Sequence, residues 1–574
     1  MLLATMTGAV ATTEQDRISA LEATLAQEHA ALAVERERVA ELTRERDRLR
    51  ASHEQHCGQP PGLQAQDAAS RLAQPARAVY APWGIDGGSS TRYAVRHHGN
   101  ERPEPPPSER HVKIHLIGIG GTGMGALAGL LKEAGHEVRG SDGPLYPPMS
   151  TLLQQLQVPV FTGHGPRNLD WGPDRVVVGN ICRVDHPEAS AARERGMNLT
   201  SFPALLGELF LLERQVIVVA GTHGKTTTAS LMAHLLRGAG LDPGYLIGGV
   251  PTSLGRSFAL GWPPHFVVEG DEYDCAYFDK RPKFVHYQPH TVILTGVEFD
   301  HADIYPSMEA VERAFSMLVE RVPAQGRILV CADSETAVRL CQEAACSVET
   351  YSVTRPAAWH AALQILPGGS QRLQIRHDEQ PVTELVLPLT GTHNASNTLA
   401  VVAAARGLGV ELDTVPASMG AFGGVRRRQE VRGVSRGVTV IDDFAHHPTA
   451  IRETLAGLRG VHGPGRLFAV FEPRSATSRR NVFQDAFADA LARADHVVLG
   501  ALHAPEGIPV EQRLDLDRIV QQLRSEGREA HHLPQVEQIV EHLASQVRAG
   551  DTVVVMSSGA FGGLIDHLLR RLGP

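Results

Sequence analysis

The sequence VAGTHGKTTTA, Val219 to Ala229, is the stretch of this chain that decides its fold. The apolar run before it, Gln215 to Ala220, predicts a buried parallel strand, and the apolar spacing after it predicts a helix. A strand that enters a glycine loop with Lys-Thr at the helix start places backbone N–H groups and a lysine around phosphates. The loop is the short form Gly221-x-x-Gly224-Lys225-Thr226, because Val219 stands where a strict P-loop has its first glycine. We therefore predict a nucleotide site in which the Thr226 hydroxyl faces a Mg²⁺ ion.

Length and composition indicate a multidomain globular protein. The chain has 574 residues, and at roughly 150 residues per domain this predicts three or four domains. A net charge of −9 argues against a general nucleic-acid binder. The sequence contains no apolar run long enough to span a bilayer and no basic region typical of a signal peptide. Its six cysteines lack paired spacing, which argues against disulfides and a zinc site and favours a cytoplasmic location.

The first 110 residues differ in kind from the rest. Residues 1–52 include a charged helical pattern with a seven-residue repeat between Ile18 and Leu49. This pattern predicts a helix that could self-associate as a coiled coil, and a solvated single helix or a disordered segment stays open. Residues 53–110 are rich in proline and glycine and predict a disordered linker.

A second glycine loop follows the predicted strand that begins at His111. Gly118, Gly120 and Gly123 satisfy the pattern GxGxxG, and Asp142 follows about twenty residues later at the end of another predicted strand. This loop suits any bound diphosphate. A dehydrogenase would use it in the same way, but would leave the loop at 221–226 unexplained.

Acidic residues follow two further predicted strands. Glu269 to Glu272 come after Phe266–Val268, and Asp300 and His301 come after Thr291–Leu294. Because ligands bind at the carboxyl edge of a parallel sheet, we expect a Mg²⁺ site there with Thr226 and Glu269 as ligands. We expect Asp271, Glu272 and Asp300 to be solvated loop acids.

Ordered blocks along residues 111–574 carry a resemblance. They are GIGGTGMG at 118–125, GTHGKTT at 221–227, EGDE at 269–272, DH at 300–301, GTHNASN at 391–397, GGVRRRQE at 423–430 and DDFAHHPT at 442–449. Together they resemble the Mur ligase family, the ATP-dependent amide-bond enzymes of peptidoglycan assembly. Segments 271–287, 298–305, 471–483 and 555–564 resemble the branch that joins UDP-N-acetylmuramate to the murein tripeptide L-alanyl-γ-D-glutamyl-meso-diaminopimelate.

The resemblance implies an α/β fold of three domains. Residues 111–214 would form a Rossmann-like domain that binds the UDP-sugar. Residues 215–432 would form a central ATP-binding domain, P-loop ATPase-like, with a parallel sheet. Residues 433–574 would form a C-terminal Rossmann-like domain that binds the peptide.

The resemblance also implies the site residues. Those for the UDP-sugar are Gly118, Gly120, Gly121, Gly123, Ser141 and Asp142. Those for ATP are Gly221, Thr222, His223, Gly224, Lys225, Thr226, Thr227, Asn394, Asn397, Arg428 and Asp443. Thr226, Glu269 and His301 would bind Mg²⁺, and the catalytic residues would be Lys225, Glu269, His301 and Arg428. The peptide carboxylates would meet Arg474, Ser475, Ser478 and Arg479, because a guanidinium fork suits a carboxylate.

The implied reaction begins with phosphorylation of the lactyl carboxylate of UDP-N-acetylmuramate by ATP. The peptide amine then attacks the acyl phosphate, behind a closed C-terminal domain that excludes water. Such a ligase would recycle cell-wall peptides. Two alternatives stay open: the sibling ligase that adds free L-alanine, and a non-catalytic nucleotide-binding sensor or scaffold. Departures from the family pattern at Gly270, Gly296, Ala476 and Ser558 affect fine substrate contacts and not the reaction class.

Overall fold

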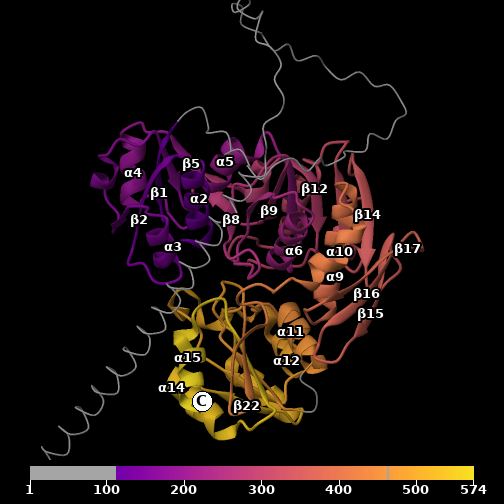
Figure 1. Cartoon of the computed structure of the whole chain (residues 1–574). Helices are drawn as coiled ribbons and strands as arrows, with labels where there is room; N and C mark the ends of the chain where they lie inside the picture. The colour runs from indigo at the N-terminus through magenta and orange to yellow at the C-terminus, as the bar shows by residue number, and fades with distance from the viewer. Residues whose placement is uncertain (1–110, 462–464, 574) are drawn as a thin grey trace, which may run out of the picture. The chain divides into compact units, whose positions relative to one another are not determined.

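The computed structural model of the chain describes residues 111–461 and 465–573 (Figure 1). The predicted helix over residues 1–52 and the predicted linker over residues 53–110 lie outside the described residues. From residue 113 onward, strands and helices alternate along the chain, and the strands form three larger sheets among the described residues.

The first sheet is parallel and has the strand order β3-β2-β1-β4-β5. Its strands are β1 (Lys113–Ile117), β2 (Glu137–Asp142), β3 (Val160–Thr162), β4 (Arg175–Val178) and β5 (Leu199–Ser201). The connecting helices are α2 (Thr122–Glu133), α3 (Met149–Gln155), α4 (Pro187–Glu194) and α5 (Phe202–Leu206). Parallel neighbours need such crossovers, and the Rossmann-like prediction is confirmed.

The second sheet has the order β17-β16-β15-β14-β13-β12-β6-β9-β7-β8. Its strands are β6 (Gln215–Ala220), β7 (Gly244–Leu246), β8 (Phe258–Ala259), β9 (His265–Gly270), β12 (Pro289–Leu294), β13 (Arg327–Cys331), β14 (Ser347–Ser352), β15 (Trp359–Ile365), β16 (Gln371–His377) and β17 (Gln380–Leu387). The run from β7 to β15 is parallel, as predicted. The antiparallel strands β8, β16 and β17 extend it at both edges and were not predicted.

The helices of this region include α6 (Lys225–Gly238), α7 (Met308–Val319), α8 (Glu335–Leu340), α9 (Thr392–Gly407) and α10 (Val415–Gly420). A separate hairpin pairs β10 (Asp274–Ala276) with β11 (Asp279–Pro282). The first and second sheets share one apolar core. At their junction α2 packs against β8 so closely that a Cβ on Gly129 would lie 2.0 Å from the Phe258 ring.

The third sheet has the order β18-β19-β23-β20-β21-β22 and is parallel except for β18. Its strands are β18 (Glu430–Ser435), β19 (Val438–Asp443), β20 (Leu467–Phe471), β21 (His496–Leu499), β22 (Glu529–His532) and β23 (Thr552–Met556). Helices α11 (Pro448–Val461), α12 (Gln484–Leu491) and α13 (Leu516–Ser525) cover one face. Helices α14 (Val536–Gln546) and α15 (Leu564–Leu572) cover the other. β18 spans the boundary between residues 432 and 433 that we propose for the last two domains.

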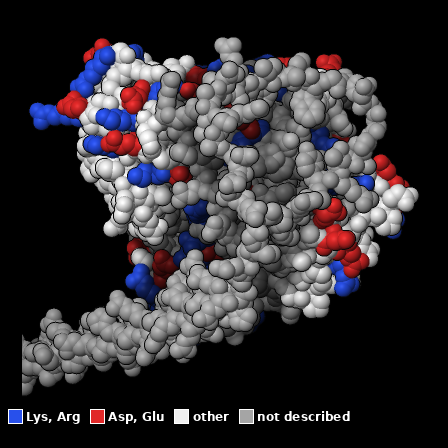
Figure 2. All heavy atoms as spheres, turned by 45° about the horizontal axis from the view of Figure 1, so that its top comes forward, with Lys and Arg blue, Asp and Glu red and all other residues white. Residues whose placement is uncertain are grey.

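Acidic and basic side chains are intermixed on the face of the described residues that Figure 2 shows. Over the same residues, we find no helix with the length and apolarity that crossing a bilayer requires. The cysteines of the described part are unpaired thiols: Cys182, Cys275, Cys331, Cys341 and Cys346.

Candidate active site

The loop from Gly221 to Gly224 connects β6 to the first residue of α6, Lys225. Gly221 has a φ of 127° and Gly224 a φ of 80°, a region that side chains rarely adopt. A Cβ on Gly221 would lie 2.3 Å from the Thr295 hydroxyl oxygen, and one on Gly224 would lie 2.8 Å from Asn397 Oδ1. Both positions therefore require glycine for backbone conformation and for space.

Lys225 is held over this loop by a buried carboxylate. Its Nζ atom donates to Gly221 O at 2.6 Å and to the two oxygens of Glu272 at 2.9 and 3.1 Å. The side chain of Glu272 is 2% exposed and that of Lys225 15% exposed. Burial by itself would lower the pKa of Lys225, but the charges of Glu272 and Asp271 outweigh it and raise the pKa. The ammonium group therefore stays charged at the site where the sequence predicts phosphates.

Glu272 also binds the histidine that follows β12. Its Oε1 lies 3.0 Å from His301 Nε2. Burial would lower the pKa of His301, but the Glu272 hydrogen bond and the Asp300 charge raise it. Glu272 thus connects the acidic segment after β9 with the histidine after β12 and with Lys225.

The expectation that Asp271, Glu272 and Asp300 are solvated loop acids was wrong. Glu272 and Asp300 are buried, and Asp271 forms an ion pair of 2.6 Å with Lys283. The chain packs over these loops, and Tyr305 Oη donates to Glu272 O at 2.6 Å. Nothing in the local sequence distinguishes an acid covered in this way from a solvated one.

Glu269 and Thr226, two of the residues predicted to bind Mg²⁺, lie in contact with each other. Thr226 Oγ1 donates to Glu269 Oε2 at 3.1 Å, and Gly248 N–H donates to Glu269 Oε1 at 2.5 Å. Burial raises the pKa of the Glu269 carboxyl, although the Gly248 N–H and the charges of Lys225 and Arg428 act in the opposite direction. A threonine hydroxyl and a half-buried carboxylate supply oxygen ligands of the kind that a hard divalent cation prefers.

The segment after α10 brings further predicted residues to this site. Arg428 Nη2 donates to Thr226 Oγ1 at 3.3 Å, and the Arg428 guanidinium lies over the Phe444 ring. Asp443 is buried and accepts from Gln429 N–H and Ala445 N–H, both at 2.7 Å. Asp443 therefore holds the turn that presents Arg428.

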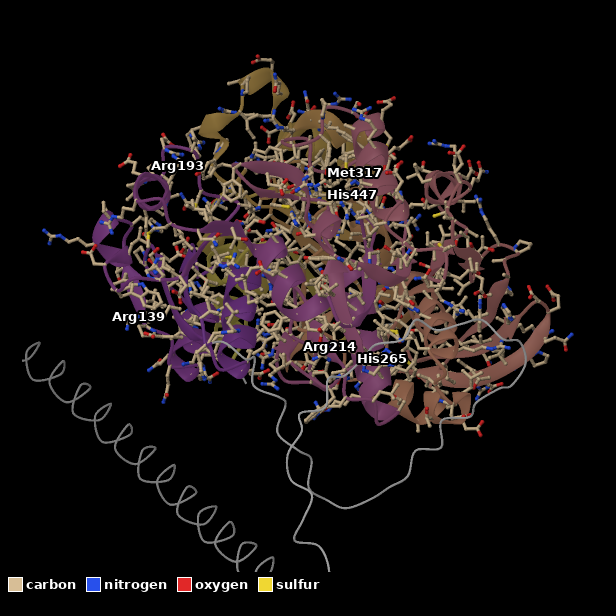
Figure 3. All side chains as sticks on the ribbon, turned by 90° about the horizontal axis from the view of Figure 1, so that it is seen from above. Arg139, Arg193, Arg214, His265, Met317 and His447 are labelled. Atoms are coloured by element: carbon tan, nitrogen blue, oxygen red, sulfur yellow. The ribbon has the colours of Figure 1, made fainter. Side chains whose placement is uncertain are left out.

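Glu298, in the loop that follows β12, joins the glycine loop to the segment that follows β19. Its Oε2 lies 3.3 Å from His223 Nε2, 2.8 Å from Thr449 Oγ1 and 3.8 Å from Nδ1 of His447, which Figure 3 labels. Burial raises the pKa of Glu298, but His223, Thr449 and His447 outweigh burial and lower it to about 2. Our sequence analysis did not single out Glu298 or His447. The only available signal was their position within the blocks at 298–305 and 442–449.

The chain matches known proteins over most of its length. The family models that match are "Mur ligase family, catalytic domain" at residues 113–214, "Mur ligase middle domain" at 219–405 and "Mur ligase, glutamate ligase domain" at 426–559. The UDP-N-acetylmuramate–L-alanyl-γ-D-glutamyl-meso-2,6-diaminoheptandioate ligase of Escherichia coli K12 is 41% identical over 462 residues, which cover 80% of this chain and 98% of that protein. The chain belongs to the Mur ligase family. Members of this family are ATP-dependent, ADP-forming ligases, and this chain is an enzyme of that class.

Solved structures agree with this assignment. The murein peptide ligase of Psychrobacter arcticus is 36% identical with a TM-score of 0.62, and the match covers 80% of this chain and 99% of that chain. The UDP-N-acetylmuramate–alanine ligase of Thermotoga maritima is 25% identical with a TM-score of 0.67, with the same coverage of both chains. Structural likeness alone therefore does not separate the two branches of the Mur ligases.

In the first domain of this Mur ligase, three of the predicted glycines lie between β1 and α2, and Gly123 lies in the first turn of α2. Asp142 Oδ2 accepts from Gly120 N–H at 2.7 Å, so Asp142 shapes the glycine loop. Ser141 is fully buried and donates to Glu188 Oε1 at 2.9 Å. Gly118, Gly120, Gly121 and Gly123 thus surround the start of α2 together with Asp142, whereas the Ser141 hydroxyl faces the interior.

The predicted peptide-binding residues follow β20. Arg479 Nη1 donates to the carbonyl oxygens of His503 at 3.1 Å and Ala504 at 2.8 Å. Ser478 is buried, and its Oγ accepts from Ser475 Oγ at 2.9 Å. The side chain of Arg474 is 36% exposed, and its Nη1 lies 3.2 Å from His503 Nδ1. Arg474 is therefore the residue of this set whose guanidinium is best placed to receive a carboxylate.

The predicted asparagines lie on α9. Asn394 Nδ2 donates to Thr390 O at 2.7 Å and fixes the start of the helix. Asn397 lies against Gly224 of the glycine loop. Both are buried, so α9 packs against the glycine loop. The loop is also held by Thr222, whose Oγ1 accepts from Glu298 N–H at 2.9 Å. Thr227, also buried, lies in the first turn of α6.

Proposed function

We propose that this Mur ligase joins UDP-N-acetylmuramate to the tripeptide L-alanyl-γ-D-glutamyl-meso-diaminopimelate, using ATP and an acyl-phosphate intermediate. The observation that carries the proposal is a site in which Lys225 and His301 both contact Glu272, and Thr226 beside Lys225 contacts Glu269, in a chain 41% identical to the E. coli ligase with that name. The product would return a recovered cell-wall peptide to a sugar nucleotide. We also propose a cytoplasmic location, which unpaired cysteines favour.

The first step transfers the γ-phosphoryl group of ATP. A lactyl carboxylate oxygen attacks the phosphorus, the bond to the bridging oxygen breaks, and ADP leaves. Lys225 and the N–H groups of the glycine loop would balance the charge that spreads over the phosphoryl oxygens. Thr226, Glu269 and His301 would hold Mg²⁺, which would neutralise phosphate charge when bound.

The second step forms the amide bond. The neutral peptide amine attacks the acyl carbon, the tetrahedral intermediate collapses, and inorganic phosphate leaves. Arg428 lies beside Thr226, where its charge would stabilise the phosphate oxygens. Arg474 would receive a peptide carboxylate in a bidentate pair. Self-association through residues 1–52 stays a prediction.

Phosphate release from ATP tests the proposal. Full-length enzyme would be incubated with Mg²⁺, ATP and UDP-N-acetylmuramate, with the tripeptide in one reaction and L-alanine in another. We expect release with the tripeptide and a matching gain of mass on the sugar nucleotide. Release with L-alanine alone would assign the chain to the sibling branch. Nucleotide binding without turnover of either amine would favour the sensor or scaffold.

A further inference from the structure

A group of histidines lies in the C-terminal domain, on β21, β22 and α14. Figure 1 labels β22 and α14. Glu529 and His531 are two residues apart on β22, so their side chains share one face of the strand. His496 on β21 is the register partner of Glu529, and His542 lies on α14, which covers this face. None of these residues belongs to the candidate active site.

The potential ligand atoms are close to one another. One atom each from Glu529, His531 and His542 lies within 4.8 Å of the others. His531 Nε2 is 3.5 Å from Glu529 Oε1, and the rings of His531 and His542 are 4.4 Å apart between centroids. Ligands on a tetrahedral zinc ion, with bonds of about 2.0–2.1 Å, are separated by roughly 3.3 Å. Small side-chain rotations would therefore bring these atoms to that spacing.

The hydrogen bonding leaves these atoms available. His531 Nε2 is buried and has no hydrogen-bond partner within the described residues. Two imidazoles and a carboxylate are the donors of a His₂Glu zinc site with an open fourth position.

His496 completes the surroundings of this group. Its Nδ1 lies 3.2 Å from Glu529 Oε2 and, like His531 Nε2, makes no hydrogen bond within the described residues. The His496 ring stacks on Phe468 at 4.2 Å between centroids, which fixes its plane. Arg466, whose Nη1 is 3.5 Å from His496 Nε2, is neutralised by Asp551.

We propose that Glu529, His531 and His542 bind a zinc ion that ties β22 to α14. The cysteine spacing argued against a zinc site, but this group contains no cysteine. Two similar groups in the described residues are less suitable. His223, Glu298 and His447 belong to the candidate active site, and in Cys275, Asp279 and His286 both oxygens of Asp279 are taken by Arg281 at 2.9 Å.

The bound ion would stabilise the C-terminal domain. A ligand that binds the folded chain and not the unfolded chain raises the midpoint of thermal unfolding in a concentration-dependent way. Glu529 is exposed, and His531 and His542 are half-buried, so the ion has a path from solvent.

Zinc titration of metal-free full-length chain tests the site. We would compare wild type with His531→Gln and His542→Gln by calorimetry, and record the visible absorption of bound Co²⁺ as a probe of tetrahedral geometry. The matched control is His532→Gln, because His532 is the next residue on β22 and pairs with Asp517 on the other side.

Wild type and His532→Gln should bind one zinc ion more than the two site variants. Loss of affinity at that site should exceed the roughly 10- to 100-fold that removal of an outer-shell partner costs. Added zinc should raise the melting temperature of wild type and His532→Gln only. Equal zinc binding by all four proteins would overturn the proposal. Glu529→Gln replaces either site variant that does not fold.

Discussion

Single residues decide how charge is arranged at the active site, and Glu272 is the clearest case. It is 2% exposed and contacts both Lys225 and His301. A buried ion pair of this kind adds little net stability, but removal of one partner leaves a buried charge unpaired. We infer that Glu272 is a positioning residue that holds Lys225 ready for the γ-phosphate.

Glu272→Gln should lower kcat by about 100-fold, the size of effect expected when an electrostatic element of the transition state is displaced. The amide keeps the shape of the side chain but removes the carboxylate charge that contacts both Lys225 and His301. Steady-state phosphate release measures the effect. Asp303→Asn is the control, because Asp303 is exposed and lies two residues from His301. An unchanged kcat in Glu272→Gln would contradict the positioning role.

His447 should make stability depend on pH. Burial, with the nearby His223, lowers the pKa of His447 to about 4, below the ordinary value near 6.5. On lowering the pH, His447 takes up its proton in the unfolded chain before it does so in the folded chain. The stability contributed by the neutral, buried His447 is therefore present above pH 6.5 and is lost as the pH falls toward 4. At about 1.4 kcal/mol per pKa unit, the loss is on the order of 3 kcal/mol.

Thermal unfolding of His447→Gln between pH 7 and pH 4 measures this contribution. The variant should be less sensitive to acid than wild type over that range. Parallel curves for the two proteins would mean that His447 titrates alike in the folded and unfolded chains.

At the scale of elements, the loop between β6 and α6 depends on its glycines. In Gly221→Ala, the new Cβ would lie 2.3 Å from Thr295 Oγ1 and 2.7 Å from Gly296 O, and φ is positive. We expect the loop to shift and ATP affinity to fall at least tenfold, measured by calorimetry. Gly507→Ala is the control, because nothing lies within 4 Å of its Cβ. Wild-type affinity in Gly221→Ala would show that the loop tolerates a side chain.

The helices and strands that the sequence predicts are those marked by a pattern of neighbouring residues, such as an apolar run followed by glycines. The run Gln215–Ala220, the glycines after it and the strand before Gly118 give β6, α6 and β1 as the structure has them. The sequence analysis did not predict the antiparallel strands β16 and β17, because partly exposed strands joined by short turns have no sequence motif. The roles of Glu272 and Glu298 were missed because their contacts are with residues distant in sequence, such as Tyr305 and Thr449.

At the scale of the whole molecule, contacts join the central and C-terminal domains beside the glycine loop. Thr449 Oγ1 donates to Glu298 at 2.8 Å, and Ala302 N–H donates to Thr477 Oγ1 at 3.2 Å. Glu298 also contacts His223 of the loop. We therefore expect a nucleotide bound at the loop to be coupled to the position of the C-terminal domain.

Thr449→Val removes the hydroxyl and keeps the side-chain shape. Loss of one such hydrogen bond, about 0.5–1.5 kcal/mol, should reduce kcat/KM for ATP by roughly 2- to 10-fold. Steady-state kinetics at saturating sugar nucleotide and peptide measure it. Thr383→Val, on β17 and away from the site, serves as the control. An effect of equal size in both variants would rule out a specific role for the contact.

We propose that this Mur ligase selects a peptide amine over free L-alanine, and a competition reaction measures that selection. Full-length enzyme would receive ATP, Mg²⁺ and UDP-N-acetylmuramate with equal concentrations of the tripeptide and L-alanine, and mass spectrometry would identify the product. We predict the UDP-N-acetylmuramyl tripeptide in large excess. A product that contains only the added alanine would contradict the account.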